Sequence, residues 1–190
     1  MADPSLYTFP SPLEGYRGLE PLSIEKCTEG PNAKAFINPA PTTPSQAYNA
    51  FTDPISNGTR GGFDIHIYYV QTNEDEVHFA TELHERIRRE FPELRIYRVW
   101  DRPVGPHPVA MFEVNVHTPQ QFGAFIPWLV INRGPLSALV HPNTGDDVRD
   151  HTQLATWMGQ PIPLQVGFLR QFVKRKAERE RAAQSNGAAV

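Results

Sequence analysis

The spacing of apolar residues changes along the chain and indicates where strands and helices lie. Apolar and polar residues alternate from Phe63 to Tyr69, which predicts a strand with one buried face. From Val77 to Phe91 the apolar residues are three and four positions apart, so this segment is predicted to form a helix that Pro92 ends. A short strand is expected from Leu94 to Trp100. This part of the chain therefore has the order strand, helix, strand.

A second strand, helix and strand are expected after a proline-rich turn. Alternation from Ala110 to Val116 predicts the third strand. Thr118 and Pro119 are typical of a helix N-cap and first turn, and the helix is expected to stop at Gly134. The fourth strand is expected from Leu136 to His141. The complete order is that of the split βαβ, or ferredoxin-like, fold.

This α+β fold has both helices on one face of the sheet and leaves the other face open. We expect the first and third strands to be central and parallel, with the fourth strand antiparallel beside the first. Nine of the 19 prolines lie in the first 60 residues, so residues 1–60 are predicted to form an irregular arm. The domain is expected at residues 61–164. Residues 165–190 are expected to form a helical, partly disordered tail.

Composition excludes several classes of protein. No stretch approaches the roughly 20 apolar residues that cross a bilayer, and the first residues do not resemble a secretory signal. A net charge of -3 gives no general attraction to nucleic acid or to anionic lipid. With Cys27 as the single cysteine, any metal must be held by histidines and carboxylates. These features predict a cytoplasmic protein that binds neither nucleic acid nor membranes.

Alternation within the strands brings polar side chains to the open face. This face is expected to carry seven candidate residues, namely Asp64, His66, Tyr68, His107, Glu113, His117 and His141. His66, His107 and His141 are expected to gather at one end of the sheet, about 30 Å from His117. Neutral imidazoles are common metal ligands, so the three histidines could form a metal site. Alternatively, each is an ordinary half-buried strand residue.

One further histidine follows a turn that begins at His141. Val148, His151, Ala155 and Met158 are spaced as on a helix, which turns His151 toward the domain. At that position His151 is either an acid or base beside the site or a hydrogen-bonded core residue. The sequence pattern does not separate the two alternatives.

Several segments of the chain together resemble the DOPA 4,5-dioxygenase family. The resemblance covers about Gly62 to Leu164, and its strongest part is the last of the following segments. They are Phe63-Asp-Ile-His-Ile-Tyr-Tyr69, Val104-Gly-Pro-His-Pro108, Phe125-Ile-Pro-Trp-Leu129, Asn132-Arg-Gly134 and Leu139-Val-His-Pro-Asn-Thr-Gly-Asp146. This family is ferredoxin-like in fold and is named for the extradiol cleavage of L-DOPA on the route to betalain-type pigments.

The resemblance implies a non-haem Fe(II) ion held by His66, His107 and His141. The catechol oxygens and dioxygen would bind at its open positions, and a ring-opened semialdehyde would form. Glu113 is a possible carboxylate ligand in place of one histidine. The resemblance also implies an acid or base, for which His151 is the first choice and His117 the second.

The same resemblance implies residues that orient the ligands and the substrate. Asp64 is expected to orient a metal ligand or to lie against the substrate. Tyr68, Arg102 or Arg133 is expected to meet the substrate carboxylate, and the sequence does not choose among the three.

Two other function classes agree with the same pattern. A metal-free ferredoxin-like module could bind a small aromatic ligand or assemble through its open face. A metal-dependent hydrolase would keep the ion but not require oxygen. A homodimer is compatible with either a dioxygenase or a binding module, and histidine ligands alone do not distinguish Fe(II) from Zn(II).

Overall fold

The computed structural model of the 190-residue chain describes residues 9–40, 43–59 and 61–187. Its described residues fall into two compact units, which divide between residues 45 and 46. The larger unit contains the sheet and all the helices that pack on it. The domain borders expected from the sequence, at residues 60 and 164, stay predictions.

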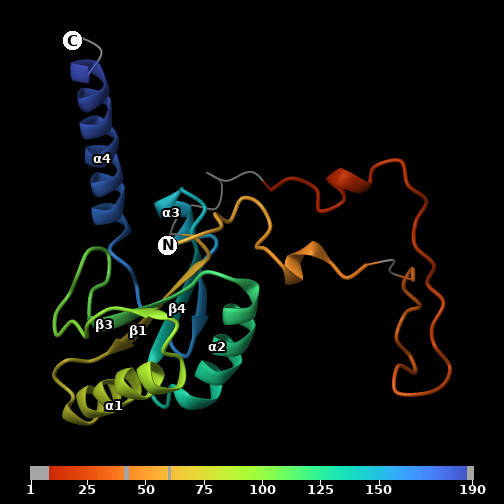
Figure 1. Cartoon of the computed structure of the whole chain (residues 1–190), viewed down its shortest axis with the longest axis horizontal. Helices are drawn as coiled ribbons and strands as arrows, with labels where there is room; N and C mark the ends of the chain where they lie inside the picture. The colour runs from red at the N-terminus through yellow and green to blue at the C-terminus, as the bar shows by residue number, and fades with distance from the viewer. Residues whose placement is uncertain (1–8, 41–42, 60, 188–190) are drawn as a thin grey trace. The chain divides into compact units, whose positions relative to one another are not determined.

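The larger unit has an α+β fold with the predicted order of elements. Within the described residues its strands are β1 (Phe63–Tyr69), β2 (Arg95–Ile96), β3 (Ala110–Val116), β4 (Ser137–Pro142) and β5 (Thr156–Met158), arranged β2-β3-β1-β4-β5. Helices α1 (Glu74–Glu90) and α2 (Pro119–Asn132) both cover one face (Figure 1). The ferredoxin-like α+β fold is therefore confirmed.

The direction of the central strands differs from the sequence expectation. Strands β1 and β3 pair antiparallel, with Phe63 opposite Val116 and Tyr69 opposite Ala110, so the expected parallel pairing is wrong. Helix α1 returns the chain so that β2 runs in the direction of β1. Strand β3 then reverses direction to pair antiparallel with β2 and lies between the two. The first residues of β3 consequently lie beside the last residues of β1.

Side-chain caps begin the two covering helices. The Asn73 side chain accepts hydrogen bonds from the backbone N–H groups of Asp75 and Glu76 at the start of α1. Thr118 accepts one from the backbone N–H of Gln121 at the start of α2, which confirms the predicted cap. The apolar faces of both helices pack on the inward side chains of β1, β3 and β4 and form the main core.

The segment after β4 is a short helix followed by a strand, and the expected longer helix is wrong. Helix α3 (Asp147–Asp150) has only four residues, and after it the Arg149 carbonyl accepts from the backbone N–H groups of Thr152 and Leu154, which is a turn and not a helical pattern. The Asp150 carboxylate accepts from the backbone N–H and the hydroxyl of Thr144 and fixes the segment before the helix. After a turn, β5 joins the sheet with Trp157 opposite Leu139. Asp146 caps the start of α3, because its side chain accepts from Arg149 N–H.

The second sheet face is covered by connecting segments rather than left open. Tyr68, Met111 and Leu139 form a buried apolar cluster there. Two groups of residues pack on it. Trp100, Val104 and Val109 come from the β2–β3 connection, and Ala155, Trp157, Ile162 and Leu164 come from β5 and the residues on either side of it. The polar groups of this face are therefore enclosed.

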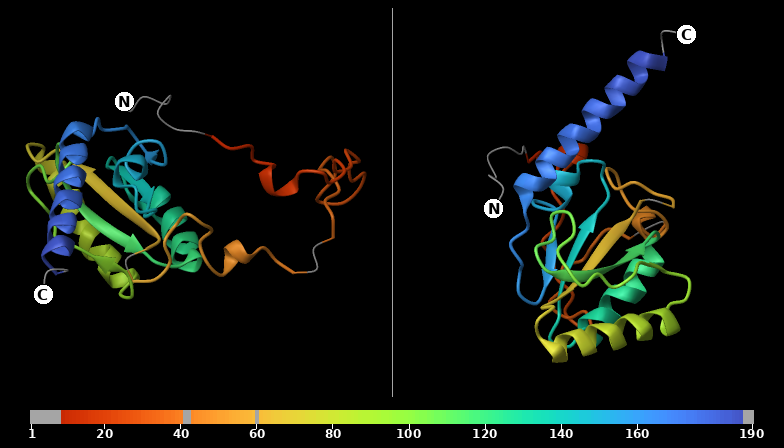
Figure 2. Two further views of the ribbon diagram at one scale, coloured as in Figure 1. Left: turned by 90° about the horizontal axis from the view of Figure 1, so that it is seen from above. Right: turned by 90° about the vertical axis from the view of Figure 1, so that its left-hand side faces the viewer.

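The ends of the chain have few contacts. In the smaller unit, the residues with described burial are exposed except Cys27, which is half-buried. The described part of this unit includes a short 3-10 turn, η2 (Glu14–Tyr16), and a β-bridge between Lys26 and Phe36. A second 3-10 turn, η3 (Gln46–Tyr48), begins the larger unit. Helix α4 (Val166–Gly187) starts beside α3 and extends away from the sheet (Figure 2).

Helix α4 lies within the segment 165–190 that was expected to form a helical tail, and the partial disorder expected of this tail stays a prediction. Residues 188–190 lie outside the described part. None of the helices in the described residues is both long enough and apolar enough to span a membrane.

Candidate metal centre

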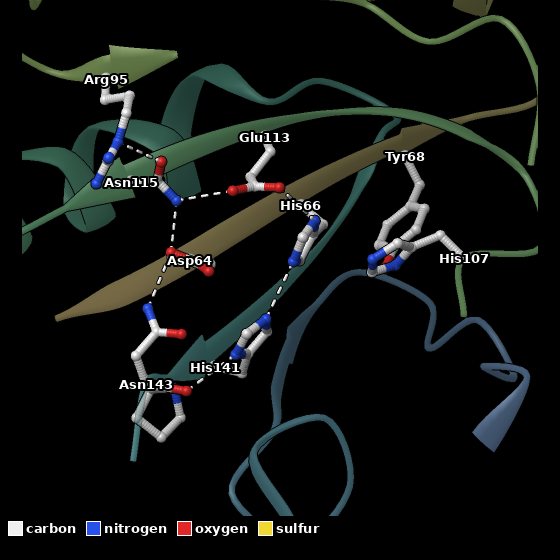
Figure 3. Close-up of polar contacts among 10 residues, drawn as sticks. Asp64, His66, Tyr68, Arg95, His107, Glu113, Asn115, His141 and Asn143 are labelled. Atoms are coloured by element: carbon white, nitrogen blue, oxygen red, sulfur yellow. Dashed lines mark hydrogen bonds and ion pairs between the residues drawn. The ribbon is translucent and has the colours of Figure 1, made fainter. Parts of the chain in front are cut away.

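The register of the sheet places polar side chains in two rows on the enclosed face. Asp64 in β1 lies opposite Asn115 in β3 and His141 in β4. Two residues further along β1, His66 lies opposite Glu113 in β3. His66 and His141 are therefore diagonal neighbours on the same face (Figure 3).

Three histidines bring their ring nitrogens together in this enclosed space. His66, His141 and His151 each offer one nitrogen, and the three nitrogens lie within 4.8 Å of one another. The Nε2 atoms of His66 and His141 are 3.0 Å apart, and the ring centres of His141 and His151 are 3.9 Å apart. His151 reaches the sheet because α3 and the turn before it bring the chain back over β4. We call these three residues the histidine cluster.

Backbone carbonyls fix the rings of two members. The Nδ1–H of His141 donates to the carbonyl of Pro142 at 3.0 Å, and the Nδ1–H of His151 donates to the carbonyl of Asp147 at 2.8 Å. A neutral imidazole that carries its hydrogen on Nδ1 has a bare Nε2. Both rings therefore present an unprotonated nitrogen to the shared space, which is the usual arrangement of metal-binding histidines.

Burial keeps these imidazoles neutral. Desolvation, followed by the neighbouring histidines, holds the pKa of His66 well below its usual value. Desolvation also lowers the pKa of His141, and it lowers the pKa of His151 to about 4. At neutral pH the cluster therefore carries no positive charge that would repel a metal ion.

The geometry of the cluster fits a divalent transition metal. Two imidazole nitrogens that bind one ion at about 2.1 Å and at a right angle are about 3.0 Å apart. This is the observed separation between His66 and His141 Nε2. The other His66 nitrogen, Nδ1, is buried and has no hydrogen-bond partner among the described residues. The donor set suits Fe(II) and Zn(II) alike.

His107 lies beside the histidine cluster and pairs with Tyr68. Its ring centre is 4.2 Å from that of His66, and its Nδ1 is 2.7 Å from the Tyr68 hydroxyl. It is brought there because β3 begins where β1 ends. Burial, followed by His151 and His141, lowers the pKa of His107 to about 3, and burial followed by Glu113 raises the pKa of Tyr68. The geometry thus groups His151, rather than His107, with His66 and His141.

The carboxylates Glu113 and Asp64 lie behind the rings. Glu113 Oε2 is 3.8 Å from His66 Nδ1, on the side of the ring away from Nε2. Its other oxygen accepts a hydrogen bond from Asn115 at 2.8 Å, and burial raises the pKa of this carboxyl. Asp64 accepts from Asn115 and from Asn143. Neither carboxylate belongs to the histidine cluster.

The remaining candidates from the sequence lie elsewhere. His117 accepts a hydrogen bond from Arg95 and donates to the Gly61 carbonyl, so both its nitrogens are engaged. Arg133 donates to the Leu136 carbonyl at 2.6 Å. Arg102 is exposed in the turn before β3. Within the described residues, no hydrogen bond or ring contact joins these three side chains to the histidine cluster.

Three residues of the polar network were not singled out as site residues from the sequence. Asn115 is recognisable from strand alternation, which places it on the same face as Glu113. Asn143 lies in the His-Pro-Asn-Thr-Gly-Asp segment, which carries the family resemblance. No sequence pattern indicated that Arg95 belongs to this network, because β2 has only two residues and no visible alternation of apolar and polar positions. Its guanidinium donates to Asn115 Oδ1 at 2.9 Å.

Comparisons with known proteins give a family match for most of the larger unit. The sequence profile of the Dopa 4,5-dioxygenase family matches residues 63–168. A fungal protein of Botryotinia fuckeliana, named only as an uncharacterized 21.2 kDa protein, is 59% identical over 184 residues, which cover 93% of this chain and 99% of that protein. The DOPA 4,5-dioxygenase of Amanita muscaria is 38% identical over 110 residues. That match covers 55% of this chain and 48% of the Amanita protein, about half its length.

A solved structure shares the fold. A candidate dioxygenase from Nostoc punctiforme superposes with a TM-score of 0.53 and 35% sequence identity. The match covers 68% of this chain and 99% of the Nostoc chain. The segment that the family profile matches contains β1 to β5 with the helices α1 to α3 and therefore the histidine cluster.

Proposed function

The chain belongs to the DOPA 4,5-dioxygenase family, and from this membership we propose that it is a non-haem Fe(II)-dependent extradiol dioxygenase that opens the ring of L-DOPA or a related catechol. The observation that carries the proposal is the convergence of three neutral imidazoles from β1, β4 and the α3 turn. The name of the Amanita relative supports a DOPA-like substrate. Family membership by itself supports an oxygenase.

His66, His141 and His151 are the proposed ligands of the iron. His107, which the resemblance implied as the third ligand, is replaced in this role by His151 because the nitrogens of the latter converge with the other two. A bound ferrous ion supplies neighbouring positions for the catechol oxygens and for dioxygen and lets electron density pass from one to the other. Fewer than six protein ligands leave these positions open.

The reaction balances without an external reductant. One carbon–carbon bond of the ring breaks beside a hydroxylated carbon, and both atoms of dioxygen enter the product. One new oxygen completes a carboxylic acid and the other an aldehyde, so the electrons that reduce dioxygen come from the catechol itself. The protein must then bind the catechol, accept a proton from its second hydroxyl and keep bulk water away.

His107 is the proposed proton acceptor. With Nδ1–H donated to the Tyr68 oxygen, its Nε2 is bare, while Tyr68 holds the ring in place. Burial lowers the pKa of His107 to about 3 in the empty site, so proton uptake there requires the negative charge of the bound catecholate, which raises this pKa. His151 was the first choice for this role from the sequence, but its bare nitrogen lies in the ligand group. The apolar cluster of Tyr68, Met111 and Leu139 excludes water on one side of the site.

Replacing Tyr68 with phenylalanine tests the role of this pair. The variant removes the hydroxyl that orients His107, so we expect kcat/KM for the catechol to fall about 10²-fold with iron content unchanged. Steady-state oxygen uptake and metal analysis measure the two quantities. Tyr97→Phe is the matched control, because Tyr97 is exposed. Wild-type kinetics in iron-loaded Tyr68→Phe would contradict the assignment.

The proposed activity is tested by oxygen consumption. Protein loaded anaerobically with Fe(II) is mixed with L-DOPA and oxygen, and uptake is followed together with the absorption of a yellow ring-opened product. We expect one dioxygen per L-DOPA, and mass spectrometry with labelled dioxygen should find two added oxygen atoms. Zn(II)-loaded protein is the matched inactive control. Iron-loaded protein that consumes no oxygen with L-DOPA or simpler catechols would overturn the proposal.

A further inference from the structure

We propose that Glu113 is a positioning residue that accepts a hydrogen bond from the Nδ1–H of His66 and thereby leaves His66 Nε2 bare for the metal ion. This inference rests on the metal site of the proposed function. It differs from the expectation that Glu113 binds the ion directly. The argument comes from the hydrogen-bond roles of three side chains on β1 and β3, all visible in Figure 3.

His66 is the one member of the histidine cluster whose ring no backbone carbonyl fixes. His141 Nε2 is bare, so the 3.0 Å contact between the two Nε2 atoms requires His66 to supply the hydrogen. An ion that binds both Nε2 atoms takes the place of this hydrogen. In the neutral ring the hydrogen then belongs on Nδ1, a buried nitrogen with no hydrogen-bond partner among the described residues.

Glu113 is placed to receive that hydrogen. The Oε2 atom of Glu113 lies 3.8 Å from His66 Nδ1, which is within ion-pair distance. When the hydrogen is on Nε2, Nδ1 and Oε2 are both acceptors and do not bond. When the hydrogen moves to Nδ1, the pair becomes a donor and an acceptor and can close. A carboxylate behind a metal-binding histidine generally orients the ring and strengthens the ligand.

Asn115 fixes the direction of the Glu113 carboxylate. One Asn115 N–H donates to Glu113 Oε1 at 2.8 Å, and Asn115 also donates to Asp64. Its amide oxygen accepts from Arg95 Nε at 2.9 Å, so a turned amide would place an NH₂ group against a guanidinium. The orientation of Asn115 is therefore determined. It leaves Glu113 Oε2 as the oxygen that faces His66.

Replacing Glu113 with glutamine reverses the polarity of this contact without changing the size of the side chain. Asn115 donates to the amide oxygen of the new residue, so its NH₂ group faces His66 Nδ1. An NH₂ group in this position favours the His66 tautomer with hydrogen on Nε2. That tautomer cannot bind the ion through Nε2. We expect the dissociation constant for Zn(II) to rise about 10- to 100-fold. Competition with a chelator measures it. Glu113→Asp keeps the carboxylate and should recover part of the affinity.

Glu82→Gln is the matched control. Glu82 makes an exposed pair with His78 at 3.3 Å on α1, so the same substitution breaks a histidine–carboxylate pair outside the site. Nitrogen NMR of the His66 ring supplies a readout that a merely structural role would not move. Zinc-loaded wild type should carry its hydrogen on Nδ1, and zinc-free protein should carry it on Nε2.

The outcomes separate this inference from the proposed function. Equal zinc affinity in wild type and folded Glu113→Gln, or a hydrogen on His66 Nε2 in the zinc-loaded wild type, would overturn the inference alone. Wild-type protein that binds neither Zn(II) nor Fe(II) would overturn the metal site and the inference with it. If Glu113→Gln does not fold, the ring-nitrogen NMR of zinc-loaded wild type decides the question, because it needs no variant: hydrogen on His66 Nδ1 supports the inference and hydrogen on Nε2 overturns it.

Discussion

Replacing His141 with alanine is expected to weaken metal binding by at least about 10²-fold and to abolish ring cleavage. Protein zinc sites bind with about 10–16 kcal/mol, so one of four ligands contributes about 3 kcal/mol, which is a factor of about 10². His141 also gives a bare Nε2 that faces His66 at 3.0 Å. Chelator competition and metal analysis of the purified protein measure the effect.

The controls for this experiment use the other histidines. His107→Ala should retain the metal but lose most activity, because His107 lies beside the histidine cluster and not in it. His78→Ala, on the exposed surface of α1, should change neither. If His141→Ala bound metal as tightly as wild type while His107→Ala lost it, the ligand set proposed here would be wrong. His151→Ala serves as a second ligand variant because His151 is less buried.

Replacing Phe112 with alanine is expected to lower the free energy of unfolding by about 3–5 kcal/mol. Phe112 is fully buried in the middle of β3, where its ring packs against helix α1 and meets the ring of His84 edge-on. Its removal leaves a cavity that neighbouring strands cannot close. Urea denaturation followed by tryptophan fluorescence measures the loss, since Trp100, Trp128 and Trp157 all belong to the larger unit.

Ile131→Ala is the matched control for the core variant. Ile131 is 79% exposed at the end of α2, so its replacement should change the free energy of unfolding by no more than about 0.5 kcal/mol. A loss below about 1 kcal/mol in Phe112→Ala would show that this part of the core is loosely packed.

The order of elements could be predicted because its signals are local. The alternation in β1 and β3 and the three-and-four spacing of α1 are properties of neighbouring residues, and so is the Thr118 cap of α2. The same alternation placed Asp64, His66 and Glu113 on one face correctly. Local patterns therefore give the elements and the face on which each side chain lies.

The site required information that is not local. The relative direction of β1 and β3 decides whether His107 meets the start or the end of β1, and no pattern within one strand records it. β5 has only three residues, too few for a visible alternation. The chain turns directly after α3, where the Arg149 carbonyl accepts from the backbone N–H groups of Thr152 and Leu154, so His151 is directed by a turn rather than by a helical stripe. Each of these depends on tertiary contacts.

The placement of the histidine cluster would link folding to metal binding at the proposed site. His66 and His141 are 75 residues apart in sequence, and His151 follows His141 by ten positions. An ion bound to all three would cross-link a central strand to the segment after β4, and an unfolded chain does not hold the three rings together. Free energy gained on binding therefore adds to the free energy of folding. If the proposed metal site is correct, the metal-free chain is therefore less heat-resistant and more protease-sensitive than the metal-bound chain.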